Sequence, residues 1–431
     1  MTLTPWGDSS QLRARKLAPG YRLPPESVAR NQRWRILAAM IAAVAEHGYE
    51  RTAVRNVVEL SGVSRTAFYR QFANKEDCFA VAVGEAIDFA MAAVRSAYSG
   101  DGSWDRRLLA AFDAFVEQIV EQPAAARACL IEVYVAGGAA TKRADAGLAA
   151  FEQMVQASYD QSPRHAGLPA PVVRGIVGGV RKVVYTSLRE DREAGLGELA
   201  PDLVRWALSY EAPAEALRRP KSRPLEPAPR PADDDQVERI FAALVDVVVE
   251  KGYQAMTLDD VAERAATSLS TFYSHFRTKR DAFLAAYDAG AARTYAAALP
   301  AYRRAPDWPH AVRAALEGML TFLAREPQWA HAGVVEVLAA GVDGMERRDH
   351  AIATFAALLE PGYELAPEVP RLAADAIGGA VFDLLYEQVL RHGPARLPDL
   401  LPVTTFIALA PFVGSDRAVA VANERARRRP R

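Results

Sequence analysis

The stretch SRTAFYRQFANKEDCF at residues 64–79 returns as SLSTFYSHFRTKRDAF at residues 268–283. Seven of the sixteen aligned positions are identical, where ordinary residue usage would give about one by chance. The same displacement of 204 positions relates Gly48 to Gly252 and Phe68 to Phe272. The chain therefore contains an internal duplication, which we describe as a first and a second repeat.

Length and composition limit the possible classes of protein. A chain of 431 residues exceeds one typical core and predicts two or three domains. Its net charge of -1 requires any nucleic-acid contact to come from locally basic patches. Cys78 and Cys129 have no C-x-x-C partner and lie in apolar surroundings, so buried thiols are predicted. No apolar run approaches a membrane span, and we expect a cytoplasmic protein without membrane contact.

Apolar residues follow helical spacing throughout, and we predict an all-α fold. Ile36, Met40 and Val44 form one stripe that ends at Gly48. Residues 211–235 are rich in proline, which predicts an extended linker between the repeats. Residues 1–30 predict a disordered basic arm, and residues 416–431 predict a basic tail.

The opening block follows a short helical segment and a glycine turn, SGVS, at residues 61–64. Ser64 suits the N-cap of a second short helix. Two short helices joined by such a turn describe a helix-turn-helix. The predicted motifs run from Ala53 to Phe72 and from Thr257 to Phe276.

The second helix of each motif has two different faces. Phe68 and Phe72 belong to a core face, and the opposite face carries basic and hydroxyl groups that suit base edges and phosphates in a major groove. The predicted DNA-contacting residues are Ser64, Arg65, Thr66, Tyr69, Arg70 and Lys75 in the first repeat, and Ser268, Ser270, Thr271, Tyr273, His275 and Lys279 in the second.

These residues resemble the DNA-binding domain of the TetR/AcrR family of transcriptional regulators, over residues 33–80 and again over residues 237–284. The resemblance implies helical proteins that dimerise and release operator DNA when a small ligand enters a C-terminal domain. It implies two TetR-like units here, each a three-helix DNA-binding domain followed by a helical ligand-binding and dimerisation domain. The expected DNA-binding domains are residues 32–92 and 236–296, and the expected helical domains are residues 93–210 and 297–415.

The two repeats differ where DNA would be contacted. Gly62 in the turn of the first motif corresponds to Ala266, and Arg65 corresponds to Leu269. The start of the first helix is basic in the first repeat (RNQRWR from Arg30) and acidic in the second (DDQVER from Asp234). Acidic residues there either cap a helix or repel phosphates. We therefore expect the first repeat to supply most of the DNA affinity.

Segments 172–189 and 371–391 each combine an apolar stripe with a Gly-Gly pair. With segments 199–210 and 400–412 they resemble the dimerising helix pair of the family, although ordinary core helices would have the same pattern. Either an intrachain pseudo-dimer or a homodimer of chains is consistent with the sequence. The linker is long enough for pairing within one chain, since about 25 extended residues reach about 75 Å.

Other functions have weaker support in the sequence. No catalytic motif, metal-ligand spacing or cofactor-binding motif is found, and a non-enzymatic protein is expected. A sensor that has lost DNA binding in the second or both motifs is the main alternative to a ligand-released repressor. The sequence names no effector site. Several aromatic residues could line a cavity or belong to the core: Trp104, Tyr134, Phe151, Phe322, Trp329 and Phe382.

Overall fold

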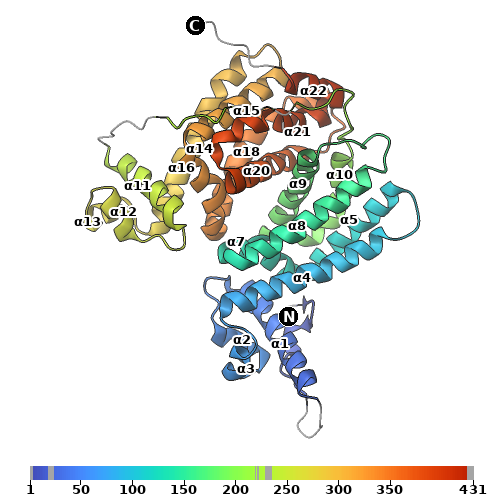
Figure 1. The fold of residues 1–431 in the computed structure, drawn as a ribbon, viewed down its shortest axis with the longest axis vertical. Helices are drawn as coiled ribbons and strands as arrows, with labels where there is room; N and C mark the ends of the chain where they lie inside the picture. Colours follow the sequence, from blue (N-terminus) through green and yellow to red (C-terminus); the bar gives the residue numbers. More distant parts are fainter. Residues whose placement is uncertain (1–2, 18–23, 219, 221–222, 229–234, 425–431) are drawn as a thin grey trace. The chain divides into compact units, whose positions relative to one another are not determined.

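The computed structural model describes residues 3–17, 24–218, 220, 223–228 and 235–424. The described residues are mostly helical (Figure 1), and the only strands among them are the two-residue pair β1, Leu3–Thr4, and β2, Gly7–Asp8. The prediction of an all-α protein is therefore confirmed.

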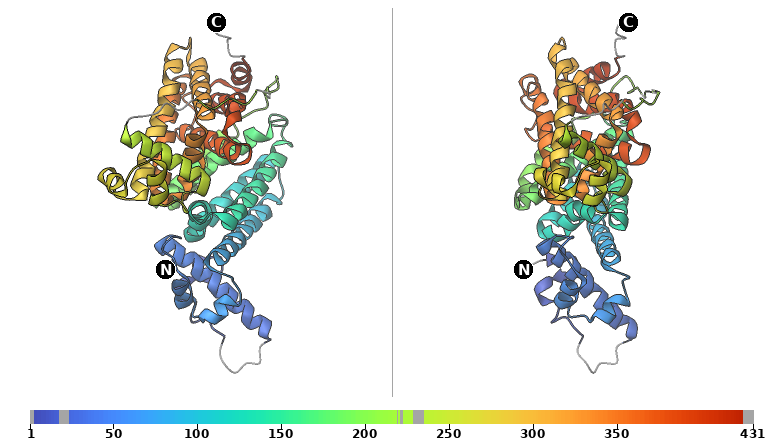
Figure 2. Two further views of the ribbon diagram at one scale, coloured as in Figure 1. Left: turned by 60° about the vertical axis from the view of Figure 1, so that its left-hand side comes forward. Right: turned by 90° about the vertical axis from the view of Figure 1, so that its left-hand side faces the viewer.

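The first repeat begins with three helices that pack against the long helix α4. In Figures 1 and 2, α1 to α3 form a small cluster at one end of α4. The elements are α1 Pro25–His47, α2 Val54–Ser61, α3 Arg65–Tyr69, α4 Lys75–Tyr98, α5 Trp104–Glu121, α6 Pro123–Arg127, the π-helical segment η2 Ala128–Glu132, α7 Val133–Ala136, α8 Gly138–Tyr159, α9 Ala170–Arg189, η3 Glu193–Gly195 and α10 Leu196–Ala207.

The second repeat follows the same order of helices as far as its π-helical segment, after which it has more elements than the first. Its π-helical segment η4 lies 204 positions after η2, as the duplication requires. The elements are α11 Gln236–Lys251, α12 Leu258–Arg264, α13 Leu269–His275, α14 Lys279–Arg304, α15 Trp308–Arg325, α16 Pro327–His331, η4 Ala332–Glu336, α17 Val337–Ala339, α18 Gly341–Ala356, η5 Ala357–Leu359, α19 Gly362–Leu365, α20 Ala373–His392, η6 Pro394–Leu400, α21 Leu401–Val413 and α22 Ser415–Ala422.

The N-terminal residues differ from the sequence prediction. Residues 3–17 form the β1–β2 pair and a 3-10 helix, η1 Ser9–Gln11, and Leu12 is buried in the core of the first DNA-binding domain. Arg13 donates to the carbonyl of Glu59 at the end of α2. The prediction of a disordered arm is wrong for these residues, because an apolar side chain inside the basic run contacts the core. Helix α1 also begins earlier than expected, at Pro25.

The linker and the C-terminal segment also make contacts that the sequence did not predict. Residues 211–218 and 223–228 have no regular structure, as expected, yet the N–H groups of Ala214, Leu225 and Ala228 donate to groups of the second repeat. The predicted basic tail is helical over α22, so that prediction is wrong up to Ala422. The basic residues 425–431 lie outside the described residues.

Two compact units make up the chain, and they do not coincide with the repeats. The first comprises residues 1–158 and 184–201, and the second comprises residues 159–183 and 202–431. Most of α9 and the second half of α10 therefore belong to the compact unit that contains the whole second repeat.

Candidate nucleic-acid interface

The first helix-turn-helix consists of α2, a glycine turn and α3. Gly62 ends α2 in the left-handed conformation, with a φ of 64°. This conformation favours glycine, because a Cβ atom raises its energy. The hydroxyl of Ser64 accepts a hydrogen bond from the N–H of Ala67 at 3.2 Å and caps α3. Ser64 is therefore first of all the cap that orients α3.

The second helix-turn-helix makes the same turn without glycine. Ala266 has a φ of 50°, so an alanine adopts the left-handed conformation in this turn. Thr257 and Asp260 form a capping box at the start of α12. Ser268 caps α13 by accepting from the N–H of Thr271 at 3.0 Å. Helix α13 continues to His275, so it is longer than α3.

In the first repeat the predicted reading face is exposed. Arg65, Thr66, Tyr69 and Arg70 are exposed, and Phe68 is fully buried on the opposite side of α3. The guanidinium of Arg65 lies 5.6 Å from the centre of the Tyr69 ring. A cation held over an aromatic ring loses little further freedom when it binds an anion. The face thus offers two arginines and a phenol from one short helix.

The second repeat exposes fewer cationic groups on α13 than the first does on α3. Leu269, Ser270, Tyr273 and His275 are exposed on α13. The Thr271 hydroxyl lies 2.8 Å from that of Ser268, and the imidazole Nε2 of His275 lies 3.3 Å from the amide oxygen of Gln236. Thr271 and His275 therefore have partners within their own domain.

Both predicted phosphate-binding lysines lie against the backbone of the preceding turn. Lys75 donates to the carbonyl oxygen of Tyr49 at 3.1 Å, and its ammonium lies 4.0 Å from the centre of the Tyr49 ring. Burial lowers the pKa of Lys75. Lys279 donates to the carbonyl oxygens of Tyr253, Gln254 and Met256, at 2.9, 3.3 and 3.0 Å. An ammonium has three donors, so Lys279 uses all of them to hold the turn after α11.

The segment at the start of α11 is acidic, whereas the aligned segment of α1 is basic, and the contacts of Asp235 give a reason for the acidic start of α11. The carboxylate of Asp235 accepts from the N–H groups of Val237 and Glu238, at 2.8 and 3.4 Å, and caps α11. Asp235 therefore has the capping role. Asp233 and Asp234 lie outside the described residues. In the first repeat Arg33 pairs with Glu85 at 3.0 Å, whereas Arg30 is exposed.

Sequence reasoning missed the basic residues that the N-terminal segment brings to the first motif. Arg13 lies against the turn, since a Cβ on Gly62 would be 3.1 Å from its Cγ. Arg15 and Lys16 follow and are exposed. In the sequence, the one indication that this basic run is ordered was the apolar Leu12 within QLRARK, which the structure buries. These cations enlarge the basic surface of the first motif.

Comparison with known proteins identifies both motifs. The model of the family described as "Bacterial regulatory proteins, tetR family" matches residues 36–82 and, separately, residues 240–286. Each range contains one complete helix-turn-helix. The chain therefore contains two TetR-type helix-turn-helix domains, one in each repeat.

Two curated proteins that are similar to part of this chain are named as transcriptional regulators. The HTH-type transcriptional activator FasR of Mycolicibacterium smegmatis is 26% identical over 155 residues, which are 35% of this chain and 59% of FasR. The uncharacterized HTH-type transcriptional regulator YdeS of Bacillus subtilis is 40% identical over 50 residues, which are 12% of this chain and 25% of YdeS. The chain thus spans less than two thirds of either relative.

Solved structures of transcriptional regulators resemble part of this chain at low TM-scores. The fatty acid degradation regulator FadR of Bacillus halodurans has a TM-score of 0.38 and 18% identity, covering 40% of this chain and 96% of that one. FadR of Bacillus subtilis, solved with stearoyl-CoA, also has a TM-score of 0.38 and 18% identity, covering 41% and 97%. The regulator PfmR of Thermus thermophilus has a TM-score of 0.31 and 21% identity, covering 38% and 96%.

Helix α9 of the first repeat packs closely on α20 of the second repeat, and the residues in contact lie within the second compact unit. A Cβ on Gly178 would lie 2.7 Å from the Cβ of Asp383, and a Cβ on Gly379 would collide with that of Lys182. The glycines therefore permit the helices to approach. The pairs 178 with 383 and 182 with 379 descend one helix while they ascend the other, so the two helices are antiparallel.

Helices α10 and α21 extend this contact. The hydroxyl of Tyr210, just after α10, donates to the carbonyl oxygen of Ile407 at 3.0 Å, and Trp206 and Tyr210 are fully buried. A Cβ on Gly175 would meet the Ile407 side chain at 2.5 Å. The four helices predicted to form the family's pairing surface are thus in contact in this structure.

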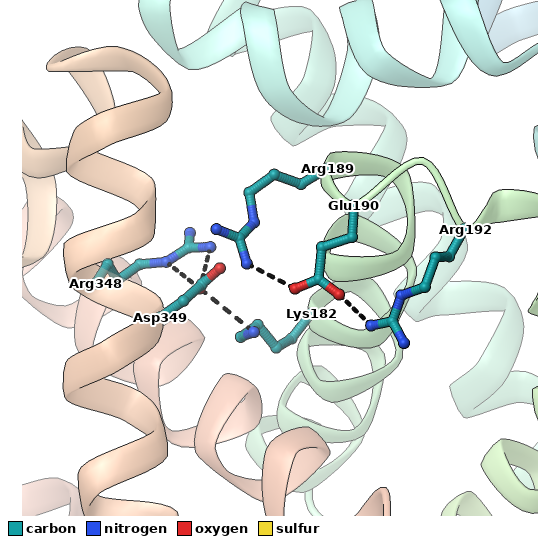
Figure 3. Close-up of polar contacts among 6 residues, drawn as sticks. All are labelled: Lys182, Arg189, Glu190, Arg192, Arg348 and Asp349. Carbon is teal, nitrogen blue, oxygen red and sulfur yellow. Dashed lines mark hydrogen bonds and ion pairs between the residues drawn. The ribbon is translucent and has the colours of Figure 1, made fainter.

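Polar side chains add to the contact with the second repeat. The ammonium of Lys182 lies 3.3 Å from the carboxylate of Asp349 on α18, which also accepts from the guanidinium of Arg348 at 2.9 Å (Figure 3). Lys182 and Asp349 are both nearly buried. Burial lowers the pKa of Lys182, and the neighbouring Asp349 carboxylate opposes that shift. A second cluster at the end of α9 joins Arg189 to Glu190 at 3.0 Å and Glu190 to Arg192.

The second repeat contains an apolar cavity of about 150 Å³. Its wall comes from α11, α14, α15, α16, η4, α18, η5, α20 and α21. Of the six aromatic residues considered from the sequence, Trp329 and Phe382 line it. Among the described residues that line the cavity, Arg348 is the one charged side chain, and its guanidinium lies 5.3 Å from the centre of the Phe382 ring.

Two further observations concern other classes of site. No group of three or more His, Cys, Asp or Glu side chains lies close enough to hold a metal ion in the part of the chain that the structure describes. Within the same residues, the segment Pro394–Val413 is apolar and long enough to span a membrane, but most of it is buried as a core helix.

Proposed function

We propose that this protein is a sequence-specific, DNA-binding transcriptional regulator that acts in the cytoplasm. The observation that carries the proposal is the pair of TetR-type helix-turn-helix motifs, each with an exposed recognition helix held by a buried phenylalanine, Phe68 or Phe272. Short helices of this kind enter the major groove and read base edges with their first residues. The proposed contacts are those of the exposed residues, led by Arg65, Thr66, Tyr69 and Arg70.

The two motifs are proposed to contribute unequally. The α3 face has two arginines, and the basic N-terminal segment lies beside it. The α13 face has Leu269 where α3 has Arg65, and an aliphatic side chain favours a thymine methyl over a guanine. The first repeat would then supply most of the electrostatic affinity, and the second would read a different half-site.

The two repeats are proposed to pair within one chain as a pseudo-dimer. The contact of α9 and α10 with α20 and α21 supports this proposal, as do the hydrogen bonds from Ala214, Leu225 and Ala228 of the linker to the second repeat. Such a chain would place two recognition helices on one operator without a second polypeptide. A homodimer of chains remains the alternative assembly.

The cavity of the second unit is the proposed effector site. Apolar cavities with few polar groups are the usual sites for small ligands. Arg348 on the wall favours a mostly apolar molecule with one acidic group, because a guanidinium binds carboxylate strongly in a dry environment. Occupation is proposed to change DNA affinity. Repression or activation then depends on where the operator lies relative to the promoter, and the relative FasR is named as an activator.

Titration of labelled duplexes at several salt concentrations tests the proposal. A regulator loses affinity steeply as salt rises, because phosphate contacts release counterions. The matched variants Tyr69→Phe and Tyr273→Phe remove one exposed hydroxyl from equivalent positions. Loss in the first variant but not in the second would support unequal motifs, and equal losses would contradict them. Absence of any DNA binding at low salt would favour a sensor without DNA-binding activity.

A further inference from the structure

The ion pairs between α9 and the second repeat all have the same polarity. The guanidinium of Arg174 lies 2.7 Å from the carboxylate of Glu387, and Arg181 pairs with Asp383. Lys182 pairs with Asp349. In every pair the cation comes from the first repeat and the anion from the second. An exact two-fold interface between identical surfaces would instead have each kind of pair twice, once in each direction.

The equivalent positions explain why the pairs occur in one direction. The glycine pairs 178–179 and 378–379 align the two helices at a displacement of 200 positions. At that displacement Arg174 corresponds to Ala374 and Arg181 to Val381, so the second repeat lacks both cations. Glu387 corresponds to Ser187 and Asp383 to Val183, so the first repeat lacks both anions.

Pairing of like repeats would therefore leave charges without partners. Between two first repeats, Arg174 and Arg181 would face Ser187 and Val183. Between two second repeats, Asp383 would face an apolar side chain, although its own side chain is only 5% exposed in the structure. Leaving a carboxylate buried without its cation is strongly destabilising. The second kind of pair would be disfavoured most.

The third pair discriminates only against a pair of two second repeats, where Phe382 stands at the position equivalent to Lys182. Asp349 lies on α18, where the displacement is 204, and its counterpart is Asp145. Lys182 would therefore find an aspartate in either kind of partner. Gly178 and Gly379 also allow close approach from both sides, so helix shape alone would accept like and unlike pairs.

We propose that Arg174 and Arg181 on α9 form a docking surface that selects the α20 face of a second repeat, through Glu387 and Asp383, and rejects another first repeat. The partner is thus α20 of the same chain, or of a second copy in a domain-exchanged dimer with one first and one second repeat at each interface. This inference rests on the proposed pairing of the two units. Selection by opposite charges, with like-charge contacts disfavouring the wrong partner, is a general route to specificity.

Charge reversal in the full chain tests this surface. One variant carries Arg174→Glu and Arg181→Glu, a second carries Asp383→Arg and Glu387→Arg, and a third carries all four substitutions. Each of the first two should melt about 5 °C or more below the wild type, because a nearly buried pair becomes a like-charge contact. The fourfold variant should recover most of this loss. Arg303→Glu with Arg304→Glu, on exposed positions in the last turn of α14, is the comparison; it opposes only the helix dipole and should lower the melting temperature much less.

Refolding the first two variants together gives a second, independent readout. In the first variant both the α9 face and the α20 face are negative, and in the second variant both faces are positive. Neither variant can therefore pair opposite charges by itself, whereas the mixture offers opposite charges at both interfaces. Light scattering should then detect a two-chain complex in the mixture and not in either variant alone. Recovery in the fourfold variant together with this complex would establish the charge selection. Double reversals that melt like the wild type, or a fourfold variant as unstable as its parents, would overturn it.

A Gly379→Leu variant separates this inference from the proposed pairing itself. The new side chain would collide with Lys182 whatever the charges. If Gly379→Leu lowers the melting temperature and the reversals do not, pairing stands and charge selection fails. If neither has an effect, the proposed pseudo-dimer fails as well. DNA binding enters neither measurement, so its absence would contradict only the proposed regulatory function.

Discussion

The carboxylate of Glu132 accepts a hydrogen bond from the backbone N–H of Tyr49 at 2.8 Å, and Glu336 binds the N–H of Tyr253 in the same way at 2.7 Å. The first bond joins the turn after α1 to the π-helical segment η2, and the second joins the turn after α11 to η4. In the second repeat the residues just before Glu336 also line the cavity. A ligand that displaces η4 would therefore act directly on the turn that Lys279 holds.

We expect Glu132 to make stability depend on pH. Burial raises the pKa of Glu132, so the folded protein holds a proton there at pH values where the unfolded chain has lost it. The contribution of this group to stability is full below its ordinary pKa and is lost as pH rises through the raised value. Glu132→Gln should flatten this part of the pH dependence, because an amide can accept from Tyr49 without ionising. Urea unfolding between pH 4 and 7 measures it, and an unchanged slope would contradict the assignment.

We expect Ala266→Gly to stabilise the protein. Glycine adopts the positive φ of this turn without strain, and relief of that strain outweighs the added freedom of the unfolded chain. The expected gain is up to about 1 kcal/mol in the free energy of unfolding. Gly62→Ala is the matched control and should destabilise by about 1 kcal/mol or more. If Ala266→Gly destabilises the protein, the turn geometry is not as described.

We expect Lys279→Met to reduce stability without reducing the salt dependence of DNA binding. The substitution leaves the carbonyls of Tyr253, Gln254 and Met256 without their donor, at a cost of about 1–3 kcal/mol. Arg70→Met is the control, because a lost phosphate contact lowers the slope of log K against log salt by about 0.9. A reduced slope in Lys279→Met would return Lys279 to the phosphate-binding role that the sequence suggested.

We expect Arg348→Met to weaken binding of an acidic ligand selectively. A fluorescent long-chain fatty acid and its alcohol share the apolar part and differ in the charge that Arg348 would bind. The variant should lose about tenfold in affinity for the acid, the worth of one charged hydrogen bond, and little for the alcohol. Arg347→Met, which removes a half-exposed cation from the same helix, is the control. Equal losses for acid and alcohol would exclude Arg348 as the binding group.

Much of this architecture was predictable, because it depends on local sequence. Gly62 and Ser64 specify a turn and a cap whatever lies around them, so both motifs were placed correctly. Contacts between distant segments were not predictable in the same way. The three carbonyls that occupy Lys279, and the burial of Leu12 beneath a basic run, depend on the packed domain. The Gly-Gly pairs that include Gly178 and Gly379 drew attention to α9 and α20 in the sequence. That the cations lie on α9 and the anions on α20 could be seen only once the contact between these helices was known.

Both cysteines are expected to be unreactive in the folded protein. Burial raises the pKa of Cys129 to about 12 and raises that of Cys78 as well. The thiolate is the reactive form, so neither residue should react with a thiol reagent at pH 8 until the chain unfolds. Rapid labelling of either thiol under native conditions would contradict this environment.

Selection of bound sequences from a random duplex library tests the central claim most directly. We expect enrichment of a bipartite site whose half-sites differ, with centres about 35 Å apart or at a multiple of the helical repeat. Light scattering should show that one chain binds each site. Arg65→Ala should relax one half-site only. A symmetric palindrome bound by two chains would contradict the intrachain pair with two different reading heads, and no enrichment at all would contradict sequence-specific binding.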